Sequence, residues 1–279
     1  MLGLDVLRAG DRAGHDVIPI ARAELDLTDA ARVHELLAAA APDAVVNCAA
    51  WTDVDGAESH REQAFAVNAD GAGNLARAAA AAGAAMVHIS TDYVFDGSAP
   101  TGPSGEPRAY LESDRPAPRS VYGESKLAGE SLVLAASPRH AVVRTAWLFG
   151  IGGRSFAATM LSLAAERPRV QVVTDQVGSP TWSGHLAPAL LGLLERGVGG
   201  LVHLAGGGSV SWNGFAAEIF RQAELDCEVA PASSADMARP APRPAWSALE
   251  SGREDVVPLP PWQDGLAGFL AARAGMVRS

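Results

Sequence analysis

The chain has a single lysine and only two cysteines among its 279 residues. Two cysteines cannot build a disulfide framework, so the composition favours a reducing compartment, and we expect a cytoplasmic protein. No apolar run is long enough to span a bilayer, and no signal-peptide pattern is visible. Acidic residues outnumber basic ones, 32 to 22, for a net charge of −10. This balance argues against nucleic acid or an anionic membrane as a partner, and an anionic ligand would need local positive groups.

What the chain does contain is an alternation of apolar strands and helices in its first half. The predicted strands are 16–20, 43–48, 85–89 and 141–145, and the predicted helices are 1–13, 28–41 capped by Thr28, 64–82 and 121–134. Segments 49–62 and 93–119 are predicted to be polar and Gly/Pro/Ser-rich loops. Strands that alternate with helices of this length indicate βαβ units and a parallel sheet.

The pattern loosens in the second half. Helices are predicted at 156–166, 185–195, 213–222 and 262–272, short strands at 171–174 and 201–204, and irregular Pro-rich chain at 230–244. We therefore expect an α/β protein with a Rossmann-like doubly wound parallel sheet and a smaller C-terminal α/β lobe. The predicted division is a dinucleotide-binding lobe, 1–147, and a mainly substrate-binding lobe, 148–279, with chain crossing between them.

The solitary lysine stands in the stretch Tyr122-Gly-Glu-Ser-Lys126, at the start of a predicted helix. Residues four apart share a helix face, so the phenol and the ammonium are expected side by side. The positive charge would lower the pKa of Tyr122, and such a phenol can protonate a carbonyl oxygen as hydride reaches the carbon. Alone, this spacing recurs by chance. Of the 22 basic residues 21 are Arg, however, so the lysine here favours a role that needs a compact ammonium.

Three successive predicted strands end in polar or aromatic groups. These ends are Asn47-Cys-Ala-Ala50, Ser90-Thr-Asp-Tyr93 and Thr145-Ala-Trp147. Ligands of open parallel sheets bind beyond the carboxyl ends of the strands, so this edge is the predicted site. His88, inside a strand, is predicted to be a structural histidine with satisfied hydrogen bonds.

Several motifs carry a resemblance to a known family. Ser90-Thr-Asp-Tyr-Val-Phe-Asp-Gly97 and Val121-Tyr-Gly-Glu-Ser-Lys-Leu-Ala-Gly-Glu130 resemble the extended short-chain dehydrogenase/reductases and, more closely, the dTDP-4-dehydrorhamnose reductase family. Segments 47–58, 144–150 and 175–181 are similar to that family as well, so the resemblance covers nearly the whole chain.

The resemblance implies an enzyme that uses NADPH, with NADH possible, to reduce the C4 ketone of dTDP-4-dehydro-L-rhamnose to dTDP-L-rhamnose. It implies a dTDP-sugar as partner and a monomer or weak homodimer. Two alternatives stay open at this point: a ketoreductase for another nucleotide deoxysugar, and a non-catalytic nucleotide-binding regulatory subunit.

Carried over by position, the resemblance assigns roles to individual residues. Tyr122 would protonate the C4 alkoxide, Lys126 would hold the nicotinamide ribose, and Thr91 would hydrogen-bond the substrate oxygen. The implied cofactor-binding residues are Gly3, Asp26, Leu27, Ala49, Ala50, Thr52, Ser90, Tyr122 and Lys126; the implied substrate-binding residues are Thr91, Asp92, Tyr93 and Trp147. Asp26 is alternatively a helix-start residue near Thr28, and Trp147 is alternatively a core residue.

Two further expectations concern the cofactor lobe. Arg22 follows the strand predicted at 16–20, where a 2′-phosphate would lie, and this favours NADPH over NADH. No metal is expected, because no acidic residue aligns near Leu2 to Leu4, where some members of the family place one for a metal-linked dimer.

The start of the chain departs from the family pattern. Dinucleotide folds begin with a strand and a Gly-x-x-Gly-x-x-Gly turn, but Met1-Leu-Gly3-Leu4 matches only the last glycine. Either the natural chain begins upstream at a non-ATG codon, or the protein lacks this strand. The 279-residue chain is then expected to leave neighbouring strands unpaired, to be less stable and to bind NADPH weakly, and an upstream extension would restore all three.

Overall fold

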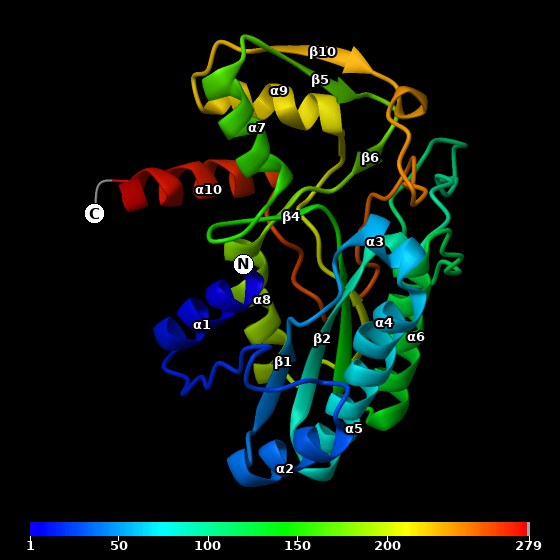
Figure 1. Cartoon of the computed structure of the whole chain (residues 1–279), viewed down its shortest axis with the longest axis vertical. Helices are drawn as coiled ribbons and strands as arrows, with labels where there is room; N and C mark the ends of the chain where they lie inside the picture. The colour runs from blue at the N-terminus through cyan, green and yellow to red at the C-terminus, as the bar shows by residue number, and fades with distance from the viewer. Residues whose placement is uncertain (278–279) are drawn as a thin grey trace.

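The centre of the protein is a parallel four-stranded sheet. The structure, a computed structural model, describes residues 1–277. The sheet has the order β1 (Ala44–Asn47), β2 (Ala85–Thr91), β3 (His140–Thr145) and β8 (Gly200–His203) (Figure 1). Its strands are short, apolar and rich in valine, as expected for strands covered on both faces.

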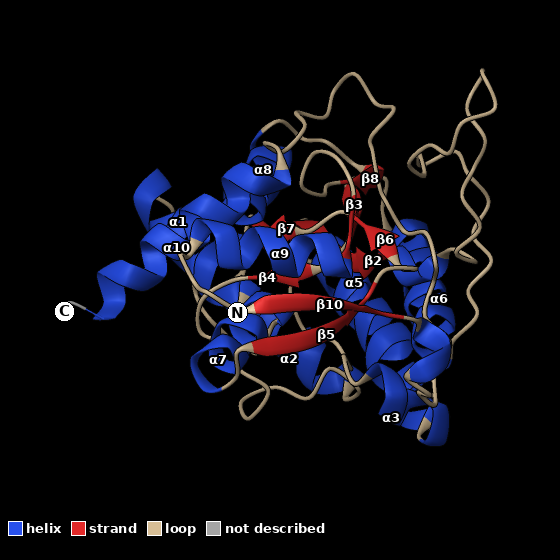
Figure 2. Ribbon diagram, turned by 90° about the horizontal axis from the view of Figure 1, so that it is seen from above, coloured by secondary structure: helices blue, strands red, loops and turns tan. Residues whose placement is uncertain are grey.

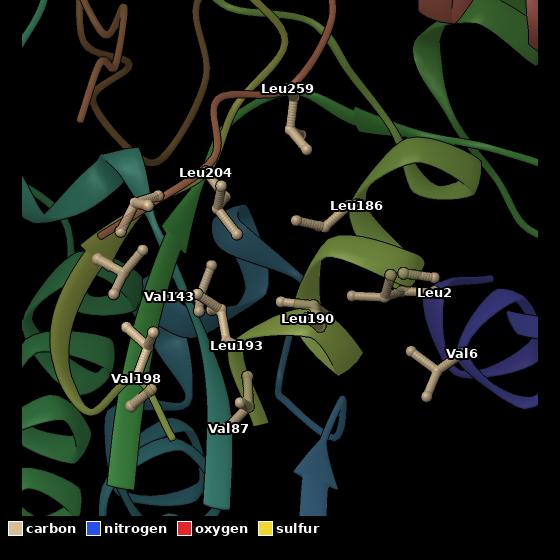
Figure 3. Close-up of a cluster of buried hydrophobic side chains, with 14 of the residues drawn as sticks. Leu2, Val6, Val87, Val143, Leu186, Leu190, Leu193, Val198, Leu204 and Leu259 are labelled. Carbon is tan, nitrogen blue, oxygen red and sulfur yellow. The ribbon is translucent and has the colours of Figure 1, made fainter. Parts of the chain in front are cut away.

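Helices cover both faces of this sheet. Val87 and Val143 pack with Leu2 and Val6 of α1 (Leu2–Ala13) and with the leucines of α8 (Ser183–Glu195) (Figure 3). Their strand neighbours Met86 and Val142 pack on the opposite side. There they meet α2 (Ala30–Ala40), α5 (Ala72–Ala81) and α6 (Val121–Ala136). This alternation confirms the predicted doubly wound parallel sheet.

The strand predicted at 16–20 is wrong. The segment pairs with no strand, and Ile18 and Ile20 are 63% and 45% exposed. A strand forms only by pairing, and within residues 1–277 no strand lies beside this segment. In the same part of the chain, β1 pairs with β2 alone among the described strands.

The helices between residues 28 and 82 differ from the prediction in three places. Asp29, not Thr28, caps α2, because its carboxylate accepts from the Arg32 amide at 3.0 Å. The predicted loop at 49–62 contains α3 (Val54–Ser59), capped by Asp53, and the start of α4 (Arg61–Phe65). The single helix predicted at 64–82 is divided into the end of α4, a π-helical turn η1 (Ala66–Gly71), and α5. Such π-turns are frequent at functional sites.

The second half builds a separate core above the sheet. Its elements are β4 (Leu148–Phe149), α7 (Phe156–Glu166), β5 (Arg169–Val173), β6 (Val177–Gly178), β7 (Thr181–Trp182), β9 (Val210–Ser211), α9 (Trp212–Gln222), β10 (Glu228–Ala232), the 3₁₀ turn η3 (Ser234–Asp236) and α10 (Trp262–Val277). Aromatic side chains of α7, α9 and α10 fill this core. Figure 2 shows β5 and β10 side by side. No helix in residues 1–277 is both long and apolar enough to cross a membrane.

Pairing across the second half corrects one more prediction. The chain predicted to be irregular from residue 230 begins inside β10, which runs parallel to β5. Further back toward the N-terminus, α8 and β8 return to the central sheet, where β8 pairs with β3. The division at 147/148 remains a prediction.

Candidate active site

Helix α6 carries both Tyr122 and Lys126 close to the carboxyl end of β2. The helix begins at Ser120, whose hydroxyl accepts from the Gly123 amide at 3.1 Å. Gly123 lies so close to the carbonyl of Tyr93 that a Cβ would overlap it, and Gly129 lies equally close to the carbonyl of Asn68. The missing side chains therefore let α6 approach both neighbouring backbones.

Thr91 and Tyr93 lie at the end of β2, beside Tyr122. The Thr91 hydroxyl donates to Asp92 Oδ1 at 3.0 Å and accepts from the Tyr93 amide at 3.2 Å. These bonds start the short 3₁₀ turn η2 (Asp92–Val94). The Tyr93 ring meets the Tyr122 ring edge-on, with centroids 5.6 Å apart. The tertiary fold thus brings three of the predicted site residues together.

The predicted lowering of the Tyr122 pKa is wrong for this structure. Burial raises the pKa of Tyr122 to about 12, and a hydrogen bond with Thr91 opposes that rise only in part. The nearby ammonium is visible in the sequence, whereas desolvation depends on the folded surroundings of the phenol. A high pKa keeps the phenol protonated at neutral pH, which is the form that a proton donor in a reduction needs.

Lys126 is buried, with 1% of its surface exposed, and lies against β2. Its Nζ donates to the Ile89 carbonyl at 2.6 Å and lies 3.1 Å from His88 Nε2. Burial lowers the pKa of Lys126 to about 8, and the charge of Glu130 acts in the opposite direction. The prediction that His88 is buried with satisfied hydrogen bonds is confirmed. The sequence did not show that one partner is the lysine of the site.

A buried ion pair fastens α6 to the sheet one turn after Lys126. The Arg144 guanidinium donates to both carboxylate oxygens of Glu130, at 2.9 and 2.7 Å, and Ser90 donates to the same carboxylate at 2.5 Å. Glu130 and Arg144 are 3% and 2% exposed. Because His88 and Ser90 share one face of β2, and Lys126 and Glu130 share one face of α6, two rows of polar contacts set the helix on the strand.

The residues predicted to lie along the cofactor sit at the open carboxyl edge of β1. Ala49 and Thr52 are exposed, and so is Gly3 in the first turn of α1, where an added Cβ would lie at van der Waals distance, 3.9 Å, from the Cβ of Cys48. Ala50 is half-buried in the same turn. A surface of small side chains beside a helix N-terminus suits a dinucleotide backbone, so these residues fit the cofactor that the sequence implies.

The other predicted cofactor residues are differently engaged. Arg22 is exposed, and Leu27 packs partly into the core while its carbonyl accepts from Asn74. Asp26 Oδ1 accepts from both the amide and the hydroxyl of Thr28. These bonds lower the pKa of Asp26, with a contribution from Arg22. Ser90 uses its hydroxyl on Glu130. Cofactor contacts by these residues remain predictions.

Trp147 has features of both a core residue and a residue of a binding site, the two alternatives that the sequence left open. It packs partly against the core, stacked on Trp212 with centroids 3.4 Å apart and the rings within 2° of parallel. It also lies two residues after the end of β3, with a φ of 47°, a left-handed conformation that is uncommon for a large aromatic residue. Strained residues cluster at functional sites, so a substrate contact by Trp147 remains a prediction.

Asp92 and Tyr93 lie on the same side of the site as basic side chains. Burial raises the pKa of Asp92 to about 6 and raises that of Tyr93. The Arg243 guanidinium lies 5.9 Å from the Tyr93 ring and pairs with Asp55 at 2.9 Å. Within this acidic protein, Arg243 supplies a local positive charge beside the predicted substrate residues.

Three side chains of the site were missed by the sequence predictions. Asn47 contacts His88 at 3.0 Å, and Glu130 anchors α6. Asn68, on the π-turn, accepts from the Trp51 amide and donates to Ser125, so it ties the β1 turn to α6. The available signal was polar residues at strand ends and inside Ala-rich helices, but these partners lie 14 to 57 residues away in the sequence.

No group of three or more His, Cys, Asp or Glu suited to a metal ion occurs in the part of the chain that the structure describes. The expected absence of a metal therefore remains a prediction.

Comparison with known proteins decides the family. A family model described as "RmlD substrate binding domain" matches residues 1–274. The chain belongs to the RmlD substrate binding domain family. A dTDP-4-dehydrorhamnose reductase of Mycobacterium tuberculosis is 47% identical, over 98% of this chain and 90% of that protein.

Two other members of similar length add to this finding. A probable dTDP-4,6-dihydroxy-2-methyloxan-3-one 4-ketoreductase of Streptomyces antibioticus is 40% identical, over 95% of this chain and 90% of that protein. The crystal structure of dTDP-4-dehydrorhamnose reductase from Bacillus anthracis in complex with NADP is 35% identical, with a TM-score of 0.91, and covers 97% of this chain and 95% of that one. The Rossmann-like architecture of this RmlD-family chain is thus shown by sequence and by structure.

Proposed function

We propose that the protein is an NADPH-dependent oxidoreductase that reduces the C4 ketone of dTDP-4-dehydro-L-rhamnose to dTDP-L-rhamnose. The observation that carries this proposal is the gathering of Thr91, Tyr122 and Lys126 at the carboxyl end of β2, in a chain of the RmlD family. Each residue type has a distinct use in the reduction of a ketone.

Tyr122 is the proton donor. Its half-buried phenol is protonated at neutral pH, and it gives that proton to the C4 oxygen as negative charge develops there. Thr91 holds the same oxygen by a hydrogen bond from its hydroxyl, and Lys126 in its ammonium form stabilises the phenolate left behind. NADPH, when bound, supplies the hydride.

Other residues at the carboxyl edge of the sheet bind and orient the cofactor and the sugar. Gly3, Ala49, Ala50 and Thr52 hold the dinucleotide at the end of β1, where small side chains allow close approach. Asp92, Tyr93 and Trp147 surround the sugar, with Arg243 beside Tyr93.

A second substrate is favoured by one comparison. The Streptomyces antibioticus relative is a probable ketoreductase of a different dTDP-hexose, at 40% identity. A regulatory role without catalysis has no such support, since the relatives are named as reductases.

The two sugars are distinguished by assay: with NADPH in excess, the purified protein should give a higher kcat/KM with dTDP-4-dehydro-L-rhamnose than with other dTDP-4-keto-6-deoxyhexoses. Identification of dTDP-L-rhamnose by NMR completes the test, and a reversed order would assign the other sugar.

Cofactor choice gives a prediction for Arg22. Its exposed guanidinium is expected to bind the 2′-phosphate, so NADPH should be preferred over NADH. Arg22→Ala should reduce that preference by roughly tenfold or more, because hydrogen bonds to charged groups contribute about 1.5–3 kcal/mol. The measurement is kcat/KM with each cofactor. Arg32→Ala, which removes another exposed arginine paired with Glu35, is the control. An unchanged ratio in Arg22→Ala would leave Arg22 without this role.

A cytoplasmic location and a monomeric or weakly dimeric state remain part of the proposal. Cys48 and Cys227 are both free thiols in the structure, in keeping with a reducing compartment.

A further inference from the structure

Behind Lys126 lies a buried chain of hydrogen bonds that catalysis by Tyr122 does not itself require. It runs from the Ala49 amide to Asn47, from Asn47 to His88, and from His88 to Lys126. Asn47, His88 and Lys126 are 4%, 0% and 1% exposed, so water does not compete for these bonds. In such surroundings each contact must join one donor to one acceptor.

The proton positions in this chain of hydrogen bonds can be assigned by starting from the Ala49 amide. A backbone N–H only donates, so the Asn47 atom 3.0 Å from the Ala49 amide is the carbonyl oxygen, Oδ1. Asn47 Nδ2 therefore faces His88 Nδ1, at 3.0 Å, and donates to it. His88 Nδ1 is then the acceptor nitrogen, and the ring proton sits on Nε2, 3.1 Å from Lys126 Nζ.

This arrangement has a consequence for the lysine. An ammonium group has only donors, and it would face the donor Nε2–H of His88. A neutral amine accepts that proton with its lone pair and still donates to the Ile89 carbonyl, at 2.6 Å. We propose that Asn47 and His88 are positioning residues. Asn47 holds His88 in the Nε2–H tautomer, and His88 thereby favours the neutral amine of Lys126.

Other groups around Lys126 act on the same equilibrium. Glu130, on the same helix, favours the ammonium, while burial disfavours it. Cys48, at the end of β1, is a neutral thiol in this pH range, because burial raises its pKa to about 11. Tyr122 lies one turn earlier on α6. Burial and the Lys126 charge lower the pKa of His88 well below its usual value, so His88 stays neutral. The balance leaves Lys126 able to change charge close to neutral pH.

The effect on turnover rests on the proposed function. The ammonium form stabilises the Tyr122 phenolate, so turnover should fall as the pH rises through the pKa of Lys126. Asn47→Asp reverses the direction of the hydrogen bonds on both sides of His88. The new carboxylate accepts from the Ala49 amide and from His88 Nδ1–H, and His88 Nε2 then accepts from the ammonium. The alkaline fall of turnover should move up by about one pH unit or more in this variant.

The single lysine allows a direct test without substrate or cofactor. Protein made with ε-¹³C-lysine has one labelled side chain, and its NMR signal reports the charge of Lys126 alone. Titration of the cofactor-free protein should give a pKa of about 8, below the usual value for lysine. Asn47→Asp should raise this midpoint by about one unit or more. The control is Asn213→Asp. Asn213 donates to the Val172 and Ala230 carbonyls in the natural protein, so this variant should leave the Lys126 midpoint unchanged.

A midpoint at the usual lysine value in the natural protein, or the same midpoint in Asn47→Asp, would overturn the proposal. Should Asn47→Asp fail to fold, ¹⁵N NMR of histidine in the unaltered protein decides the matter: a proton on His88 Nδ1 overturns it, and a proton on Nε2 supports it. None of these results depends on turnover, so a protein that reduces no dTDP-sugar would contradict the proposed function and leave this inference standing.

Discussion

Replacing Tyr122 by Phe is expected to lower turnover by about a hundredfold or more, because general acid catalysis of this kind contributes about 10²–10⁴-fold. The variant removes one hydroxyl from a ring that keeps its edge-on contact with Tyr93, so the fold and the binding of NADPH should change little. Single-turnover rates and NADPH affinity, measured on the same preparation, separate the loss of chemistry from a loss of binding.

A matched control is available in the chain. Tyr110→Phe removes a hydroxyl that donates to Asp96 and Ser98, away from α6, and should cost stability rather than turnover. Lys126→Arg should also turn over poorly, since a planar guanidinium cannot take the place of a compact ammonium in this buried site. Near-normal turnover in a folded Tyr122→Phe protein would contradict the mechanism.

The second large effect is expected from the buried pair of Glu130 and Arg144. Arg144→Leu leaves the Glu130 carboxylate buried without its cation, and should lower the free energy of unfolding by about 3–5 kcal/mol. Because Glu130 also holds α6 one turn after Lys126, the variant should lose turnover even at temperatures where it stays folded. Unfolding in denaturant measures the first effect and steady-state kinetics the second.

Two comparisons sharpen this prediction. Arg221→Leu breaks an exposed pair with Glu218 and should cost no more than about 1 kcal/mol. The double variant Glu130→Leu with Arg144→Leu removes both charges, and it should be destabilised less than the sum of the single variants, because neither charge remains buried alone. Strictly additive losses would show that the two residues do not act as a pair.

The sequence alone was sufficient to predict the class of fold, while the place of the site stays a prediction. Alternating strands and helices predicted the parallel sheet, because apolar periodicity is a local property of the chain. The family resemblance assigned Thr91, Tyr122 and Lys126 to one site; the helical spacing by itself paired only Tyr122 with Lys126, and the strand-end pattern placed Thr91 at the edge where ligands bind. Motifs spread along the chain also predicted the family that the comparisons confirmed.

Other predictions failed where a distant partner decides the outcome. The segment at 16–20 has the apolar residues of a strand, but pairing needs a neighbour, and the described chain places none beside it. Thr28 has the side chain of a helix cap, yet its hydroxyl donates to Asp26, and Asp29 caps the helix.

The protonation states of the site were decided by the tertiary structure alone. The phenol of Tyr122 was expected to become more acidic beside Lys126, whereas burial makes it less acidic. His88 is an unremarkable strand residue until Asn47, 41 residues earlier, and Lys126, 38 residues later, close around it. A pKa depends on desolvation and on every charge and hydrogen bond nearby, and these come from segments far apart in the chain. The sequence determined which groups are present at the site, and the packing of α6 on β2, with Asn47 of β1 beside His88, set the burial and the hydrogen bonds that shift their pKa values.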